Sequence, residues 1–176
     1  VLLGINFYLR NEKYGEDISI KKVEKVNEEF NARFSALNKT YKYKIFNKHF
    51  RSPLNQKDSW WVKQKINVKD MMRASNYLLG KHDFTSFRAV DCQAKSPIKT
   101  LSKISITKKK NIISISFTAR SFLYNQVRIM SGTLKDVGTG LVKPIELKNI
   151  ISAKNRSKAG PTAPAKGLTL LKVNYK

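Results

Sequence analysis

The pattern of polar and apolar positions along the chain predicts both strands and helices. Residues 40–46 alternate almost strictly, so that Tyr41, Tyr43 and Ile45 share one side, which is the period of a β-strand. The same alternation predicts three further β-segments: 16–26 with Ile18 and Ile20 inward, a hairpin over 100–119 with its turn at Lys108–Asn111, and 167–175.

Two longer segments show helical spacing instead. In residues 67–80, Asn67 can cap the first turn, Asp70 complements that cap, and Gly80 suits a left-handed stop. The second predicted helix covers residues 122–138, and its apolar stripe consists of Leu123, Val127, Met130, Leu134 and Val137. Pro144 then opens a short third helix.

The order of these elements predicts the fold class. Strands and helices alternate irregularly and the hairpin favours an antiparallel sheet, so the predicted class is α+β. The length of 176 residues is enough for one sizeable core, and no low-complexity linker or internal repeat divides the chain. We therefore predict a single domain over residues 1–176.

The net charge is the feature of the composition that limits the possible binding partners. The chain has 35 Lys and Arg against 12 Asp and Glu, a formal net charge of +23. Such a surplus repels itself unless an anion neutralises it, which makes nucleic acid the first candidate partner and an anionic membrane surface the second. No apolar run approaches the ~20 residues of a spanning helix, and no basic segment precedes the apolar start, so we expect neither a membrane span nor a signal peptide.

Side chains that bind metals are scarce. Cys92 is the single cysteine, which rules out an internal disulfide and suits a reducing, cytoplasmic setting. Together with His49 and His82 it gives no zinc-ligand spacing. The sequence therefore predicts no metal site.

Tyr41 and Arg33 are candidates for contacts with a nucleic acid. Periodicity alone favours a core position for Tyr41, but a tyrosine ring can also stack on a base, which contributes roughly 1–3 kcal/mol. Arg33 alone is an ordinary surface arginine, although beside this strand it could clamp a phosphate through two N–H groups.

Two more places carry open alternatives. Residues 82–97 form a polar stretch that is either a binding loop or a solvated loop pinned by Phe84 and Phe87. Arg128 follows Val127 in the apolar helix. If Arg128 points inward it needs a carboxylate partner, and if it points outward it is one more surface charge.

Three motifs follow one another along the chain: ARFSALNKTYKYKIFNK, LLGKHDFTSFRA and SFLYNQVRIMSGTLKDVGTG. Together they resemble the tRNA pseudouridine synthase A family, and the terminal KGLTLLKVNY is similar to that family's closing strand. The resemblance implies isomerisation of uridine to pseudouridine at positions 38 to 40 in the anticodon arm of tRNA, by a homodimer without metal or organic cofactor. The target base is flipped out of its stack, and a nucleophilic aspartate forms a covalent intermediate.

The resemblance also assigns roles to residues. It implies that Tyr41 stacks on the target base and that Arg128 pairs with the nucleophilic aspartate. It implies tRNA contacts at Phe30, Asn31, Ala32, Arg33, Phe34, His49, Asp91, Cys92, Gln93, Ala94 and Lys95. Val62 falls where some members insert an aromatic side chain to aid flipping. Valine cannot stack, so Trp60 or Trp61 would have to substitute.

The family's nucleophile is missing from this sequence. It lies in an Arg-Thr-Asp-Ala-Gly-Val-His motif, and none of the aspartates present has that context: Asp17, Asp58, Asp70, Asp83, Asp91 and Asp136. The resemblance therefore implies that Val1 lies inside the family's sequence, after an N-terminal domain and the catalytic loop. We expect these 176 residues alone to be inactive.

Two other hypotheses remain open. A non-catalytic RNA-binding module needs only the basic surface and the stacking aromatics. Alternatively the charge is compositional, because many Lys, Asn and Ile codons are AT-rich. Affinity for tRNA that falls steeply with salt would separate RNA binding from a compositional charge.

Overall fold

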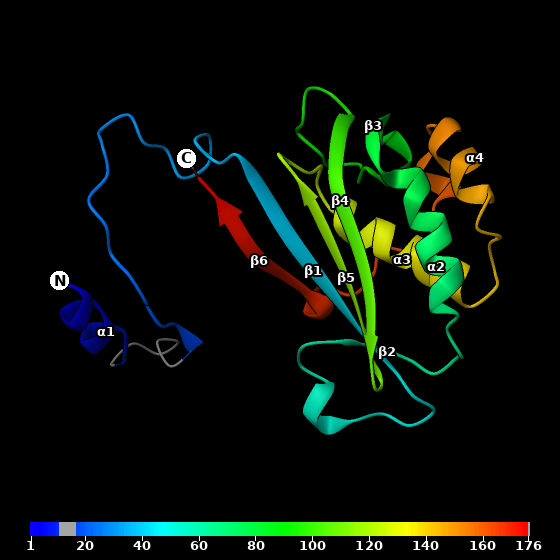
Figure 1. Ribbon diagram of the computed structural model, residues 1–176, viewed down its shortest axis with the longest axis horizontal. Helices are drawn as coiled ribbons and strands as arrows, with labels where there is room; N and C mark the ends of the chain where they lie inside the picture. Colours follow the sequence, from blue (N-terminus) through cyan, green and yellow to red (C-terminus); the bar gives the residue numbers. More distant parts are fainter. Residues whose placement is uncertain (11–16, 176) are drawn as a thin grey trace. The chain divides into compact units, whose positions relative to one another are not determined.

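The structure is a computed structural model that describes residues 1–10 and 17–175 (Figure 1). It consists of two compact units, Val1–Ser35 and Ala36–Lys176. The single domain expected over residues 1–176 stays a prediction.

The first unit contains helix α1 (Leu2–Arg10), where the sequence predicted no element. The strand predicted over 16–26 is wrong for its described residues 17–26, which form no strand and leave Ile18 about half exposed. The side-chain amide of Asn6 bonds both the N–H and the carbonyl of Ile20, at 2.9 and 2.8 Å. Alternation alone cannot make a strand, because its backbone groups need a partner strand.

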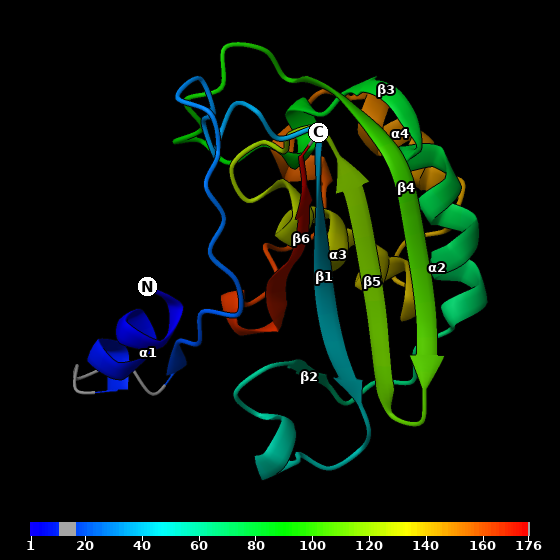
Figure 2. The same ribbon diagram turned by 60° about the vertical axis from the view of Figure 1, so that its left-hand side comes forward.

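The second unit is a six-stranded sheet with helices on one face, as Figures 1 and 2 both show. Its strands are β1 (Asn38–Asn47), β2 (Trp60–Val62), β3 (Gly80–Asp83), β4 (Ile98–Lys109), β5 (Ile112–Ala119) and β6 (Leu168–Asn174). Its α-helices are α2 (Val68–Ser75), α3 (Gln126–Gly138) and α4 (Glu146–Ser152). Short 3₁₀ turns lie at Pro53–Asn55, Asn76–Leu78, Thr85–Phe87, Arg156–Lys158 and Ala165–Gly167. This arrangement confirms the α+β class.

Strand β1 has three partners in the sheet, whose order is β2-β1-β5-β4-β3 with β6 also paired to β1. On one side it pairs antiparallel with β5 over residues 39–46. On the other side it pairs antiparallel with β6 over residues 38–43 and parallel with β2 over residues 45–47. Because β1 has partners on both sides along most of its length, its side chains are fixed in register.

The two faces of the sheet differ sharply in composition. The face toward the helices buries Tyr43 and Ile45 of β1 together with Ile113, Ile115 and Phe117 of β5. This confirms the predicted core role of Tyr43 and Ile45. The opposite face carries polar side chains, among them Thr40, Lys42, Lys44, Ser114, Ser116 and Thr118. Period-two alternation therefore separates a core face from a hydrophilic one.

Helix α2 confirms the predicted cap and corrects the predicted end. The Asn67 side chain accepts hydrogen bonds from the N–H groups of Lys69 and Asp70. The α-helix stops at Ser75 rather than Gly80, and a 3₁₀ turn follows. Gly80, at φ 93°, turns the chain into β3 instead of ending the helix.

Helix α3 begins later than predicted, at Gln126 instead of residue 122. Asn125 has a left-handed backbone, at φ 59°, which no right-handed helix can include. Helix α4 likewise begins at Glu146, two residues after Pro144, and the Glu146 carboxylate accepts the N–H of Lys143 at 2.7 Å. The predicted hairpin is confirmed, with a tighter turn at Lys110 and Asn111.

Within the described residues, no helix is long and apolar enough to cross a membrane.

Candidate functional site

Arg128, in the first turn of α3, is held in one orientation by two oxygen acceptors. Its Nε donates to the carbonyl of Ala163 at 2.6 Å, and its Nη1 donates to the side-chain oxygen of Asn125 at 3.0 Å. The side chain is half-buried, and among residues 1–10 and 17–175 no carboxylate pairs with it. The guanidinium is therefore pre-positioned by neutral oxygens, and its Nη2 makes no hydrogen bond to a described residue.

The segment 159–164 that supplies the Ala163 carbonyl lies directly against α3. The N–H of Gly160 donates to the Thr133 hydroxyl at 2.9 Å, and the N–H of Ala163 donates to the Arg128 carbonyl at 3.3 Å. A β-carbon on Gly132 would lie 1.8 Å from the carbonyl oxygen of Pro161. Only glycine at position 132 permits this approach, so it indirectly sets the position of Arg128.

Tyr41 lies on β1 where the pairing with β6 is irregular. A register shift falls between Thr40 and Tyr41. The half-buried ring meets Phe122 edge to face, with centroids 5.3 Å apart and planes at 88°. Such contacts contribute roughly 0.5–1.5 kcal/mol beyond area burial. The Tyr41 hydroxyl makes no hydrogen bond within the described chain, so the ring is anchored while its polar end is available.

Tyr43, two residues further along β1, has the opposite role. It is fully buried, and its hydroxyl donates to the carbonyl of Pro164 at 2.7 Å. Burial raises the pKa of Tyr43 far above its ordinary value, while the charge of Arg128 opposes that rise. Tyr43 therefore stays a neutral donor that fastens segment 159–164 to the sheet.

These contacts link Tyr41 and Arg128 through intervening residues, and we call the region they share the Tyr41–Arg128 corner of the second unit. Tyr41 packs on Phe122, which leads into α3, and Tyr43 lies within the electrostatic influence of Arg128. No described aspartate pairs with Arg128. Asp136, on the same helix, is paired with Lys135. The corner offers a ring and a fixed cation, but the described residues supply no nucleophile beside them.

The predicted contact loop at residues 91–95 is held from within by an arginine. Arg88 Nη2 donates to the carbonyls of Cys92 and Ala94, at 2.6 and 2.9 Å. Cys92 is buried, whereas Asp91, Gln93 and Lys95 are exposed. The loop therefore presents three polar side chains outward, and Arg88 has a structural part in it.

The thiol of Cys92 is buried among hydrogen-bond donors. Burial by itself raises the pKa of Cys92, but the N–H groups of Tyr124 and Ala94 and the Arg88 guanidinium outweigh it, so the pKa is lowered overall. Its backbone can contribute to a surface loop, but its side chain belongs to the core.

The predicted contacts after β1 fall into exposed and buried groups. His49 is exposed and meets Phe50 edge to face, with centroids 4.9 Å apart. The Val62 side chain is only 4% exposed and belongs to the core. Trp61 is partly exposed, donates its Nε1–H to the Lys48 carbonyl at 2.9 Å, and has the Arg51 guanidinium 5.6 Å from its ring centroid.

The remaining predicted contacts, Phe30 to Phe34, lie in the first unit. Asn31 folds this stretch into a turn by accepting the N–H groups of Arg33 and Phe34, at 2.9 and 3.0 Å. The Arg33 guanidinium lies 5.5 Å from the centroid of the exposed Phe34 ring. This stretch therefore presents an exposed cation beside an exposed ring.

Sequence reasoning missed Asn125 and segment 159–164. The only sequence signal at Asn125 is that asparagine tolerates a left-handed backbone. Ala163 acts through its backbone carbonyl, which its side chain does not reveal. The run AGPTAPA is unusually rich in small residues, which would suit close packing against a helix. Within the described residues, no cluster of His, Cys, Asp or Glu could hold a metal ion.

A mainly antiparallel sheet with helices packed on one face is consistent with the α+β fold of a pseudouridine synthase. Residues 74–176, more than half of the chain, match the sequence profile described as tRNA pseudouridine synthase. The chain belongs to the tRNA pseudouridine synthase family.

Relatives named tRNA pseudouridine synthase A are similar over nearly the whole chain. The protein from Anaplasma phagocytophilum (strain HZ) is 47% identical over 172 residues, covering 98% of this chain and 68% of the relative. The protein from Orientia tsutsugamushi (strain Ikeda) is 45% identical over 176 residues, covering 99% and 61%. The protein from Agrobacterium fabrum is 41% identical over 161 residues, covering 92% and 60%. The chain thus spans about two thirds or less of the length of these relatives.

Proposed function

We propose that this chain is the RNA-binding and base-holding part of a tRNA pseudouridine synthase that isomerises uridines at positions 38 to 40 of the anticodon arm. The observation that carries the proposal is the corner formed by Tyr41 and Arg128. An anchored aromatic ring with an available polar end and a fixed guanidinium suit a flipped base and the carboxylate that attacks its nucleoside.

In this proposal Arg128 has a defined task. Asn125 and Ala163 hold two of its nitrogens, which leaves Nη2 to meet a carboxylate. A carboxylate next to a guanidinium stays ionised, and only the ionised form is a nucleophile. Tyr41 stacks on the flipped uracil, and the exposed residues of loop 91–95 contact the RNA. Arg33 is a separate RNA contact in the first unit.

The nucleophile is the missing component. No aspartate in the sequence has the family's motif, and none that is described pairs with Arg128. We propose that the aspartate comes from a part of the family's sequence that these 176 residues do not include, and that the whole enzyme works as a homodimer. The isolated chain should therefore bind tRNA without modifying it.

Assaying the 176-residue chain on unmodified tRNA transcript tests both statements. We expect binding whose affinity falls steeply with salt, and no pseudouridine above background. A chimera that adds the unmatched third of the Anaplasma relative should restore pseudouridine formation. Turnover by the chain alone would overturn the assignment and make Asp83 or Asp91 the next candidate nucleophile.

The absent motif favours one alternative, a non-catalytic RNA-binding module. A chimera that folds and binds tRNA as the isolated chain does, yet forms no pseudouridine, would support that alternative. An affinity that is insensitive to salt would instead indicate that the charge of +23 is compositional.

A further inference from the structure

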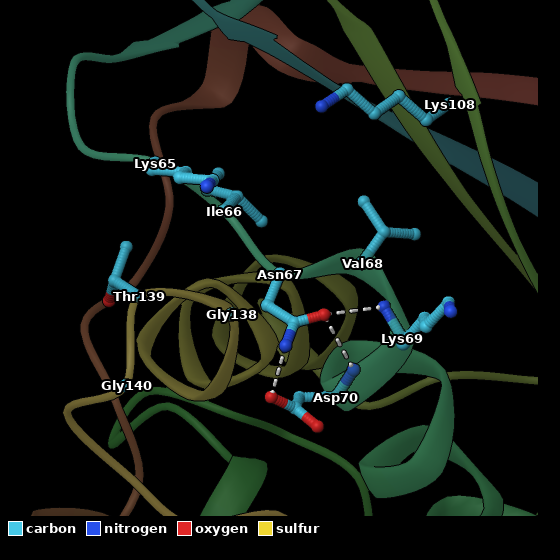
Figure 3. A pocket seen from close by; sticks show the side chains of 10 residues that line it. All are labelled: Lys65, Ile66, Asn67, Val68, Lys69, Asp70, Lys108, Gly138, Thr139 and Gly140. Carbon is cyan, nitrogen blue, oxygen red and sulfur yellow. Dashed lines mark hydrogen bonds between the residues drawn. The ribbon is translucent and has the colours of Figure 1, made fainter.

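A second site is suggested by a hollow of about 610 Å³ away from the Tyr41–Arg128 corner (Figure 3). It lies where the start of α2, the end of α3 and the tip of β4 come together. Its lining consists of Lys65, Ile66, Asn67, Val68, Lys69, Asp70, Lys108, Gly138, Thr139 and Gly140. Three separate parts of the chain therefore contribute to one cavity.

Close backbone packing builds the floor of this hollow. The N–H of Asn67 donates to the carbonyl of Gly138 at 2.8 Å, which joins the approach to α2 to the last turn of α3. A β-carbon on Gly138 would lie 2.7 Å from Ile66 and 2.9 Å from Met71, so the approach requires glycine. Gly140, at φ 82°, has no atom within 4 Å of a β-carbon position, because it faces the open side.

The charge around the hollow is strongly one-sided. Lys65, Lys69 and Lys108 are all exposed, and none is paired with a carboxylate of the described residues. Figure 3 shows them at three separate places around the hollow. The one lining carboxylate, Asp70, is already bonded to Asn67 Nδ2 at 2.5 Å and to Arg73 Nη1 at 3.3 Å.

The side chains that line the hollow indicate which class of ligand it can bind. Three unpaired ammonium groups around one cavity repel one another, and a polyanion removes that cost and releases its own counterions. The lining has no aromatic ring on which a base could stack. Lysine acts on a phosphate as a mobile point charge, without reading the base beside it. The chemistry therefore fits phosphodiester groups, not a nucleobase.

Helix α3 links this hollow to the Tyr41–Arg128 corner. Arg128 lies in its first turn and Gly138 at its end, a separation of about 15 Å along the axis at 1.5 Å per residue. A nucleic-acid strand rises by about 3.4 Å per nucleotide, so about four nucleotides span that distance. One RNA can reach both places.

We propose that the hollow formed by Lys65, Lys69 and Lys108 binds backbone phosphates of the same RNA that presents its target base to Tyr41 and Arg128. This inference rests on the proposed function, since it needs the chain to bind tRNA. It adds a phosphate site that orients the RNA and contributes affinity without sequence preference.

The test compares two triple variants with the same loss of charge. The first is Lys65→Gln, Lys69→Gln and Lys108→Gln. The control is Lys81→Gln, Lys148→Gln and Lys158→Gln, all exposed positions outside the hollow. Binding of each to an unmodified tRNA transcript is measured by fluorescence anisotropy across a series of salt concentrations.

Each lysine–phosphate contact that is lost makes the slope of log affinity against log salt shallower by about 0.7–0.9. At 0.1 M salt, that loss corresponds to an affinity about five- to eightfold lower. We expect the slope of the hollow variant to become shallower by about two and its affinity to fall at least tenfold, while the control stays within about threefold of the unmodified chain. Acetylation of Lys65, Lys69 and Lys108 by an amine-reactive reagent should also slow when tRNA is bound, while that of Lys148 should not.

The outcomes are distinguishable. If the unmodified chain does not bind tRNA, the proposed function fails and the phosphate site fails with it. If the chain binds tRNA but both triple variants lose affinity equally, the hollow is not a phosphate site and the proposed function is unaffected. Unchanged acetylation of the three lysines would also overturn the phosphate site.

Discussion

Replacing Gly132 by alanine tests whether segment 159–164 is held by close packing against α3. Helix propensity alone predicts stabilisation, because alanine in a helix interior is favoured over glycine by about 1 kcal/mol. The tertiary structure predicts the opposite sign. The new β-carbon would lie 1.8 Å from the Pro161 carbonyl oxygen, so segment 159–164 must move by roughly 1.5 Å to reach a normal contact distance.

The hydrogen bonds that this movement breaks set the magnitude. They are the bond from Gly160 N–H to Thr133, that from Ala163 N–H to the Arg128 carbonyl, and that from Arg128 Nε to the Ala163 carbonyl. Neutral hydrogen bonds contribute about 1 kcal/mol each, and those of a charged donor about 1.5–3 kcal/mol. After subtracting the gain in helix propensity, Gly132→Ala should lower the free energy of unfolding by about 2–4 kcal/mol.

Urea unfolding followed by tryptophan fluorescence measures the loss of stability of the second unit, because both tryptophans of the chain, Trp60 and Trp61, lie there. With a slope of about 2 kcal/mol per molar urea, a loss of about 3 kcal/mol moves the midpoint down by about 1.5 M. Ser131→Ala is the matched control. It removes the bond from the Ser131 hydroxyl to the Val127 carbonyl but adds no atom, so its loss should stay near about 1 kcal/mol.

A midpoint for Gly132→Ala at or above that of the unmodified chain would refute the reasoning. It would mean that segment 159–164 can move away from α3 without cost, and that Ala163 does not fix Arg128.

Three further predictions concern the site and its surroundings. Arg128→Ala should lower the unfolding free energy by about 3–6 kcal/mol through the loss of its two hydrogen bonds, with Arg128→Lys intermediate, and a wild-type urea midpoint would contradict this. In the active chimera, Tyr41→Ala should abolish pseudouridine formation while changing tRNA affinity less than about threefold, since phosphates supply most of the binding; near-normal rates would show that Tyr41 is only structural. The Thr85 hydroxyl and N–H lower the pKa of Asp83 below its ordinary 3.8, so its carboxylate stabilises the fold above that pH and the stabilisation is lost as pH falls through the lower folded value. Asp83→Asn should therefore be less stable than the unmodified chain at neutral pH and converge with it in acid, and an equal gap at both would exclude the linkage.

Local patterns were sufficient for the elements whose stabilising contacts are close in sequence. Alternation identified the β4–β5 hairpin, and Asn67 marked the start of α2, because a cap and a hairpin turn bond residues within a few positions of each other. Alternation also identified β1, although its partners β5 and β6 lie far along the chain. The motifs around Tyr41 and Arg128 likewise indicated the family before any geometry was known.

Only the tertiary structure decided which residues meet. The described residues 17–26 of the alternating segment form no strand, because strand pairing depends on a partner elsewhere in the chain. Arg128 was expected to need a carboxylate if it pointed inward. It is half-buried and is held instead by Asn125 and by the carbonyl of Ala163, 35 positions away. The hollow of Lys65, Lys69 and Lys108 is likewise assembled from segments that carry no shared sequence signal. Periodicity in the sequence indicates which side of a helix or strand faces inward. The neighbours of a charged side chain depend instead on how elements distant in sequence pack together. That packing determines the geometry of the site.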